Sequence, residues 1–163
     1  MKRMIAAFGV TLMAVPAAAQ VPASAEPLPK KEQVAAFRAA GFALRGTEWR
    51  KCDDPGTASY SPGQLRPVGD LNGDGLPEAV VTEESTFCYG MAGSGFSFVS
   101  RQKDGWKLMT ESIGMANFLS TKGVGGWPDI EIGGPGFCFP VIRWNGREYK
   151  VVRHQYQGRA CRR

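Results

Sequence analysis

The chain has 163 residues with a formal net charge of +5, and it contains 21 glycines and 11 prolines. Its length fits one ordinary domain and its charge is only mildly basic. After residue 19 no apolar run is long enough to span a bilayer, so the mature chain is expected to be soluble, without membrane association.

Residues 1–19 have the pattern of a secretory signal peptide. Lys2 and Arg3 give a positive start, residues 4–15 are apolar but too few for a stable membrane span, and small residues precede a cleavage point after Ala19. Removal of this leader leaves 144 residues with a net charge of +3. We therefore expect a periplasmic or secreted protein, a location that disfavours nucleic acid as a partner.

Four cysteines remain in the mature chain, at positions 52, 88, 138 and 161. An even number in an exported chain predicts disulfides, for which three connectivities exist. Without a Cys-x-x-Cys motif and with a single histidine, zinc or redox roles have little support. We expect Cys52–Cys88 and Cys138–Cys161, because each pair stays in one half of the chain. A pair Cys52–Cys161 would instead clasp the chain ends.

The first part of the mature chain divides into a lead and a helix. Residues 20–30 are rich in proline and small residues and are expected to be disordered. A helix is predicted over residues 31–40, with Val34 and Phe37 on one face and Gly41 as its end. Residues 31–163 are expected to form a single β-rich domain, because glycine and proline punctuate short β-rich runs from there on.

Residues 70–78, Asp-Leu-Asn-Gly-Asp-Gly-Leu-Pro-Glu, carry the strongest functional signal. Oxygen-bearing side chains occupy the first, third, fifth and ninth places, as Asp70, Asn72, Asp74 and Glu78. The glycine at the sixth place allows a sharp turn, and the carbonyl of Leu76 would add a main-chain ligand. Because calcium prefers six to eight oxygen ligands, this spacing predicts a Ca²⁺ site. A solvated turn without metal is the alternative, which four oxygen residues in register make the weaker one.

The flanks of this loop decide which kind of calcium loop it is. An EF-hand requires Glu at the twelfth place, which here is Val81, and Pro67 disfavours a preceding helix. The β-branched run that follows favours a strand, so the loop is expected to join two strands. In this context the loop resembles the FG-GAP/VCBS repeat family, whose Asp-x-Asp/Asn-x-Asp-Gly-x-x-Asp/Glu loop lies in a β-hairpin and binds calcium. The chain holds one complete loop of this type.

Two further hairpins are predicted. Residues 96–102 and 106–109 flank Lys103-Asp104-Gly105, and residues 141–144 and 147–152 flank Asn145-Gly146. Asp-Gly and Asn-Gly favour tight hairpin turns because both residues accept positive φ.

The chain also repeats itself. Gly75–Val81 aligns without a gap to Gly126–Ile132, and Phe-Cys follows each segment, at residues 87–88 and 137–138. The second copy has lost the ligands, since Thr121, Gly123 and Gly125 stand where the first has Asp70, Asn72 and Asp74. The expected fold is therefore mainly β, with two blade-like units of antiparallel hairpins packed together, one short N-terminal helix and two disulfides. A chance similarity of two Gly/Pro-rich hairpins is the alternative.

Signals for catalysis are weak. The single histidine, His154, follows the last strand run, and no Gly-x-Ser-x-Gly motif supplies a nucleophile. Glu83, Glu84 and Glu111 could act as paired carboxylates but are expected to be solvated strand-end residues. Gly133–Gly136 lacks the Gly-Lys-Ser/Thr of a phosphate loop.

These observations predict a small exported domain, not an enzyme, with a structural Ca²⁺ in a β-hairpin loop. The alternative is a periplasmic binding or inhibitor module that recognises a protein or glycan of the cell envelope. It would use a basic aromatic C-terminal face, since basic residues there alternate with Trp144, Tyr149 and Tyr156. The basic residues are Arg143, Arg147, Lys150, Arg153, Arg159, Arg162 and Arg163.

Overall fold

The computed structural model describes residues 25–162, so the expected signal peptide lies outside the described residues. Its helices are α1 (Lys30–Ala39) and α2 (Thr86–Tyr89), with short 3₁₀ turns η1 (Gly90–Ala92) and η2 (Val124–Gly126). The strands are β1 (Ala43–Arg45), β2 (Glu48–Arg50), β3 (Ser61–Gly69), β4 (Glu78–Glu84), β5 (Ser94–Gln102), β6 (Gly105–Ile113), β7 (Met115–Lys122), β8 (Pro128–Gly133), β9 (Phe139–Trp144), β10 (Tyr149–Tyr156) and β11 (Arg159–Ala160).

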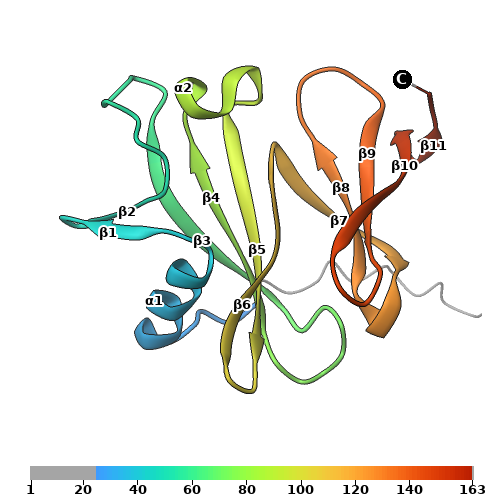
Figure 1. Ribbon diagram of the computed structural model, residues 1–163, viewed down its shortest axis with the longest axis horizontal. Coiled ribbons are helices and arrows are strands. Elements are labelled where there is room, and N and C mark those ends of the chain that lie inside the picture. Colours follow the sequence, from blue (N-terminus) through green and yellow to red (C-terminus); the bar gives the residue numbers. More distant parts are fainter. Residues whose placement is uncertain (1–24, 163) are drawn as a thin grey trace, which may run out of the picture.

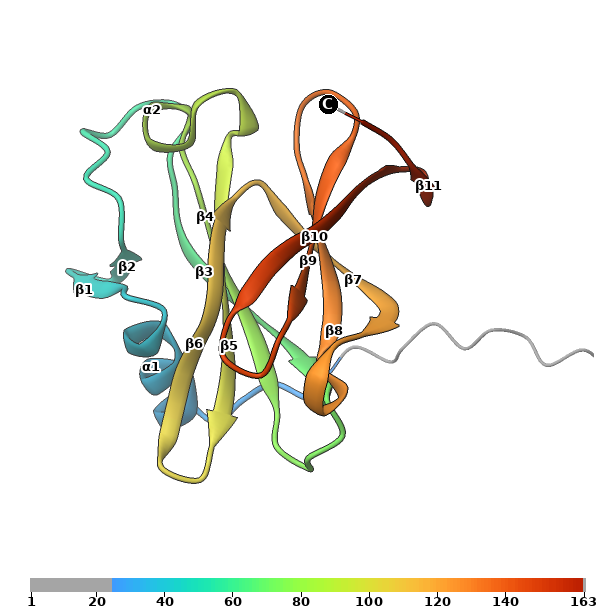
Figure 2. The same cartoon turned by 45° about the vertical axis from the view of Figure 1, so that its right-hand side comes forward.

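Two antiparallel sheets make up most of the molecule (Figures 1 and 2). The first has the strand order β3-β4-β5-β6, and the second has the order β7-β8-β9-β10-β11. Gly114 alone separates β6 from β7, and its φ of +115° suits glycine. The chain therefore passes directly from the edge of one sheet to the edge of the other.

The two sheets bear out the predicted internal repeat. Each consists of a hairpin, a segment with Phe-Cys, and a second hairpin, and β4 and β8 occupy the same second place in the strand order. Glu78 lies at the start of β4 and Asp129 near the start of β8, as the ungapped alignment requires. The expectation of a mainly β fold with two blade-like units is confirmed.

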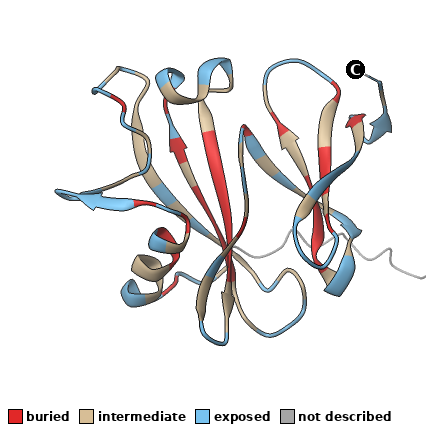
Figure 3. Cartoon of the chain, in the orientation of Figure 1, coloured by how far each residue is buried: buried red, intermediate tan, exposed pale blue. Residues whose placement is uncertain are grey.

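The core has two layers (Figure 3). One lies between α1 and the first sheet and includes Phe37, Ala79 and Val81. The other lies between the sheets, where Val80 and Phe98 meet aromatic side chains of the second sheet. Because successive residues of β4 face opposite layers, this strand is buried on both sides and is apolar over residues 79–81.

The N-terminal part differs slightly from expectation. Helix α1 is found one residue earlier than predicted, with Phe37 stacked on Trp49 at 4.7 Å between ring centroids. Leu28, expected in the disordered lead, is a core residue, and its carbonyl accepts a hydrogen bond from Gln33. The ordered domain thus begins before residue 31. Helix α2 and the β1–β2 hairpin were not anticipated.

The two predicted hairpins form, with different turns. Gln102 pairs with Gly105, so β5 and β6 are joined by a two-residue turn. The strands around Asn145-Gly146 pair only from Trp144 and Tyr149, which leaves a four-residue loop. The side chain of Asn145 accepts hydrogen bonds from the amides of residues 147 and 148. An Asx turn has replaced the expected two-residue turn, because Asn favours such local bonding as strongly as positive φ.

Both expected disulfides are present. Cys52 bonds to Cys88 and Cys138 to Cys161, so each bridge lies within one repeat unit and its flanking segment. Within residues 25–162, no helix has the length and apolar character needed to cross a membrane.

Candidate metal centre

The loop between β3 and β4 is wound around the carboxylate of Asp70. This carboxylate accepts hydrogen bonds from the amides of Gly73, Asp74 and Gly75, at 2.7, 3.1 and 2.8 Å. Gly73 and Gly75 have φ values of +87° and +84°, a region that glycine enters without strain. The first acidic residue of the motif thus fixes the backbone of the turn.

Two more oxygen residues of the motif support the same turn. Asn72 accepts a hydrogen bond from the amide of Asp74 at 2.9 Å, and Asp74 accepts one from the amide of Leu76 at 2.8 Å. The side-chain amide of Asn72 also donates to the Asp74 carboxylate at 3.0 Å. Alternate side chains therefore bond to main-chain groups two residues further on, an arrangement that follows from their period-two spacing.

Glu78 lies beneath the loop and is fully buried. Its carboxylate accepts hydrogen bonds from the amide of Leu71 at 2.7 Å and from the hydroxyl of Ser100, the residue opposite on β5, at 2.9 Å. No ion pair among the described residues includes Glu78. The pKa of Glu78 is raised from its ordinary 4.5 to about 7, chiefly by burial. The hydrogen bonds from Leu71 and Ser100 lower this pKa, and the nearby charges of Asp74 and Asp70 raise it.

The five expected ligands are thus neighbours, but they do not form a finished cage. Within residues 25–162, no three Asp, Glu, His or Cys side chains surround a common metal-sized centre. A carboxylate has about four lone-pair positions, of which the hydrogen bonds engage three on Asp70, two on Asp74 and two on Glu78. Each carboxylate therefore retains capacity for a further ligand. These oxygen donors suit calcium, whereas the absence of sulfur and imidazole disfavours zinc or copper.

At the equivalent position in the second unit, the buried acid Asp129 is paired with positively charged side chains. Asp129 is also fully buried, but it receives two hydrogen bonds from Arg143 and one from Arg153, at 2.8 to 2.9 Å, and another from Thr121 at 2.6 Å. Burial alone would raise the pKa of Asp129. The bonds from Arg143, Thr121 and Arg153 outweigh it and hold that pKa well below its usual range. Two arginines thus neutralise the second buried acid, whereas the first has no ion-pair partner within residues 25–162.

The two loops touch each other, at the same end of the two sheets (Figure 1). Lys122 donates a hydrogen bond from its ammonium to the carbonyl of Leu71 at 3.1 Å. A Cβ on Gly126 would lie 2.6 Å from the carbonyl oxygen of Asn72, and the φ of Gly126 is +79°. The loop of the second unit, which lacks the acidic residues of the first, therefore packs directly against the loop of the first unit. Only glycine at position 126 allows this close approach. Trp127, which follows, is buried against Phe98 between the sheets.

The predicted basic aromatic C-terminal face does not exist as one surface. Trp144 is 8% exposed and Tyr149 packs against it, both within the core between the sheets. Two of the arginines, Arg143 and Arg153, bind Asp129. Alternation along β9 sends Trp144 into the core between the sheets and Arg143 to the opposite face, where it binds Asp129, a distinction that a basic-aromatic composition does not reveal.

The remaining sequence candidates differ in burial and in partners. Glu83, expected to be solvated, is 1% exposed and accepts hydrogen bonds from the hydroxyls of Tyr60 and Tyr89 and from two main-chain amides. Glu84 is exposed, and Glu111 pairs with Lys51. His154 is half-buried on β10 of the second sheet, whereas the three acids belong to the first sheet. Glu83 and Glu111 thus have different surroundings, since Glu83 is buried among hydroxyls and amides and Glu111 pairs with an ammonium at the surface.

Sequence reasoning did not identify two residues that bear on the site, Ser100 and Asp129. Ser100 supports Glu78, and the predicted hairpin could have pointed to it only if the register of β4 on β5 had been known. Asp129 was aligned to Glu78 as part of the repeat, and this match of two acids at one buried position was an available signal. Comparison with protein-family models, curated proteins and solved structures finds no match to this chain.

Proposed function

We propose that this protein is a small exported calcium-binding domain without catalytic activity, in which Ca²⁺ is structural. The ligands would be the side chains of Asp70, Asn72, Asp74 and Glu78 and the carbonyl of Leu76. The resemblance of this loop to the FG-GAP/VCBS calcium loop, and its position in a hairpin between β3 and β4, support the proposal.

One observation carries this proposal: the contrast between Glu78 and Asp129. Both are fully buried acids at equivalent positions, and a buried charge is unfavourable unless it is paired. Arg143 and Arg153 supply the positive charge in the second unit. In the first unit, Glu78 has the hydroxyl of Ser100 opposite it instead of an arginine, and Asp70 and Asp74 in the loop add two more acidic groups. A divalent cation would give the first unit the charge balance that the arginines give the second.

Bound Ca²⁺ would neutralise the three carboxylates and link the loop residues Asp70 and Asp74 to Glu78 at the start of β4. The chain itself prepares this role. Asp70 holds the turn, Leu71 packs against the core between the sheets, and the amide of Leu71 positions the Glu78 carboxylate. The site thus connects a surface loop to the interface between the two sheets, where an ion would add to the stability of the whole domain.

Thermal unfolding in calcium tests this proposal. Calcium at about 100 times its dissociation constant should stabilise the protein by about 2.7 kcal/mol. For a domain of this size, each kcal/mol raises the melting temperature by about 2–4 °C or slightly more. Asp70→Ala combined with Asp74→Ala should abolish the rise. A matched double variant, Glu48→Ala with Asp53→Ala, removes the same charge from exposed positions on and beside β2 and should retain it.

An equal rise in the loop variant and the matched control would place the calcium elsewhere. An equal effect of Mg²⁺ would indicate general charge screening, because Mg²⁺ demands a smaller and more regular oxygen shell.

Two features support the structural and exported aspects of the proposal. The buried acids Glu78, Glu83 and Asp129 all have several hydrogen-bond donors, which fits a role in folding. The two disulfides fit an oxidising compartment outside the cytoplasm. Mass spectrometry of the protein recovered from the periplasm or medium should find residue 20 at the N-terminus and no free thiol.

A second candidate is recognition of an envelope protein or glycan, on a smaller surface than the sequence suggested. Phe137 is 78% exposed and lies beside the ring of Tyr156, at 6.2 Å between centroids, and Arg159 and Arg162 are exposed in the same C-terminal region. Exposed aromatic side chains of this kind often mark binding surfaces. Capture of an envelope component by the wild type but not by Phe137→Ala would favour this candidate.

A further inference from the structure

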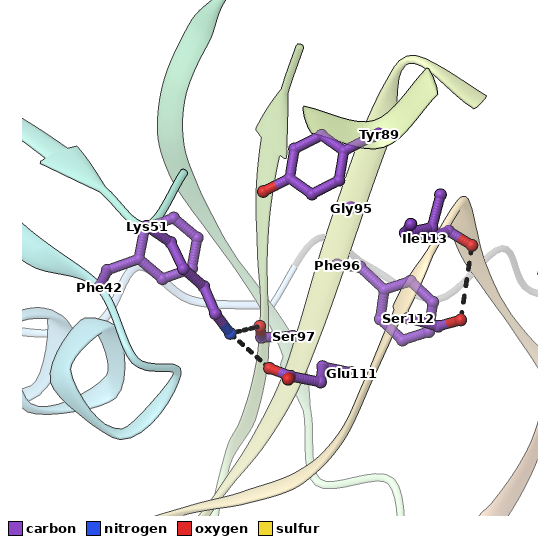
Figure 4. A pocket seen from close by; sticks show the side chains of 9 residues that line it. All are labelled: Phe42, Lys51, Tyr89, Gly95, Phe96, Ser97, Glu111, Ser112 and Ile113. Atoms are coloured by element: carbon purple, nitrogen blue, oxygen red, sulfur yellow. Dashed lines mark hydrogen bonds and ion pairs between the residues drawn. The ribbon is translucent and has the colours of Figure 1, made fainter. Parts of the chain in front are cut away.

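A cavity of about 240 Å³ opens on the outer face of the first sheet, the face that carries α1 (Figure 4). Its lining consists of aromatic rings, one aliphatic side chain and a few polar side chains, which come from segments far apart in the sequence. The residues that matter are Phe42, Lys51, Tyr89, Ser97, Glu111 and Ile113. The cavity and the loop between β3 and β4 lie at opposite ends of the sheet, because Ile113 pairs with Gly95 at one end of β5 and Glu78 pairs with Ser100 towards the other.

One wall of the cavity is a fixed aromatic ring. Tyr89 donates its hydroxyl to the buried carboxylate of Glu83 at 2.6 Å. Its ring lies on the backbone of β5, where a Cβ on Gly95 would be 2.6 Å from a ring carbon. The adjacent Cys52–Cys88 bridge joins this segment to the chain that carries Lys51. The ring is therefore held in place before any ligand enters.

Lys51 supplies the charge of the cavity. Its ammonium donates to the carbonyl of Ala40 at 2.8 Å, to the hydroxyl of Ser97 at 3.3 Å and to the carboxylate of Glu111. The first two acceptors are neutral and belong to well-buried residues. Glu111 differs, because its side chain is 51% exposed and it comes from β6, the edge strand of the sheet.

These contacts make Glu111 the replaceable partner of Lys51. An exposed ion pair contributes little to stability, so its exchange for another carboxylate is inexpensive. The main-chain carbonyl and the buried hydroxyl would keep the ammonium in place during that exchange. The side chains of Phe42, Tyr89 and Ile113 offer apolar surface to the remainder of a ligand.

We propose that this cavity binds a small carboxylic acid with an aromatic or branched apolar body. The ligand carboxylate would displace Glu111 from Lys51 and accept a hydrogen bond from the Ser97 hydroxyl, while its body packs between Tyr89 and Phe42. The volume is below the range typical for drug-sized ligands and fits an acid of the size of benzoate. This inference is independent of the calcium proposal.

Titration followed by ¹H–¹⁵N NMR tests the inference with three ligands of one shape: benzoate, benzyl alcohol and benzylamine. Benzoate should shift the amide signals of residues 95–97 and 111–113 in a saturable way, and the other two should bind at least tenfold more weakly. Lys51→Gln should weaken benzoate binding at least tenfold. Glu111→Gln should strengthen it several-fold, because it removes the competing carboxylate. Glu84→Gln, an exposed change on β4, should leave it unchanged.

Several results would overturn the proposal. Preference for benzylamine, with loss of binding in Glu111→Gln, would make Glu111 the recognition group. Benzoate shifts confined to other residues, or absent at millimolar concentration, would remove the site. Because Lys51→Gln also removes a bond to Ala40, its fold must be checked by the same spectra. The Glu111→Gln variant distinguishes the two ligand classes without Lys51→Gln, because it should strengthen the binding of an acid and weaken the binding of an amine. Stronger binding of a peptide ending in Phe than of benzoate would assign the cavity to a chain terminus.

Discussion

The buried carboxylate of Glu78 gives the account a sharp test through the pH dependence of stability. Its pKa is raised from 4.5 to about 7 in the folded protein, mainly by burial. A carboxyl with a raised pKa binds protons more tightly in the folded state. The associated stability is therefore full below about pH 4.5 and is lost as the pH rises through 7.

The magnitude follows from the size of this shift. One pKa unit corresponds to 1.36 kcal/mol, so a shift from 4.5 to about 7 gives a loss of about 2–3 kcal/mol between pH 5 and pH 8. Asp129 does not interfere in this window. Its pKa is lowered, so its contribution is lost only under more acidic conditions.

Urea unfolding at pH 5, 6, 7 and 8 without calcium measures the effect. The free energy of unfolding of the wild type should fall across this range, and Glu78→Gln should remove most of the fall. Saturating Ca²⁺ should restore the wild type at pH 8, because an ion bound to the carboxylate favours its charged form. It should not restore Glu78→Gln to the same extent. A wild-type slope that persists in Glu78→Gln would refute the assignment of the buried charge.

The remaining predictions concern the second unit and the core, each measured by urea unfolding. Arg143→Met leaves Asp129 with Arg153 as its one arginine partner and should destabilise the protein by about 2–3 kcal/mol, within the range for hydrogen bonds to a charged group. The double variant with Asp129→Asn should recover part of this loss. Replacement of Cys138 and Cys161 by Ser opens a bridge that spans 23 residues and should lower stability by about 3 kcal/mol. Phe98→Ala removes the ring that meets three aromatic side chains between the sheets and should cost about 3–5 kcal/mol. A loss below about 1 kcal/mol in any of these would contradict the contact concerned.

Local chemistry made much of this fold predictable. The segment from Asp70 to Glu78 contains its own turn, since its side chains bond to amides a few residues away. The match of Gly75–Val81 to Gly126–Ile132 predicted two equivalent hairpins before any long-range contact was known. The disulfides were expected within each half of the chain because the two cysteines of each pair are close in sequence, and both pairs are confirmed.

Features that depend on distant contacts were not predictable in the same way. Trp144 and Tyr149 look like surface aromatics between basic residues, but the pairing of β9 with β10 and the facing sheet place them in the core. Glu83 reads as one of two adjacent strand-end acids. Its burial depends on Tyr60 and Tyr89, which approach from separate segments. Periodicity identifies strands, whereas the layer that covers each face is decided by the whole chain.

A crystal structure of the protein grown with Ca²⁺ tests the central claim most directly. The account predicts a single strong metal peak in the loop between β3 and β4. Oxygens of Asp70, Asn72, Asp74 and Glu78 and the carbonyl of Leu76 should lie about 2.3–2.6 Å from it. Retention of the loop geometry without a metal peak at saturating calcium, or a peak that excludes Glu78, would contradict the claim.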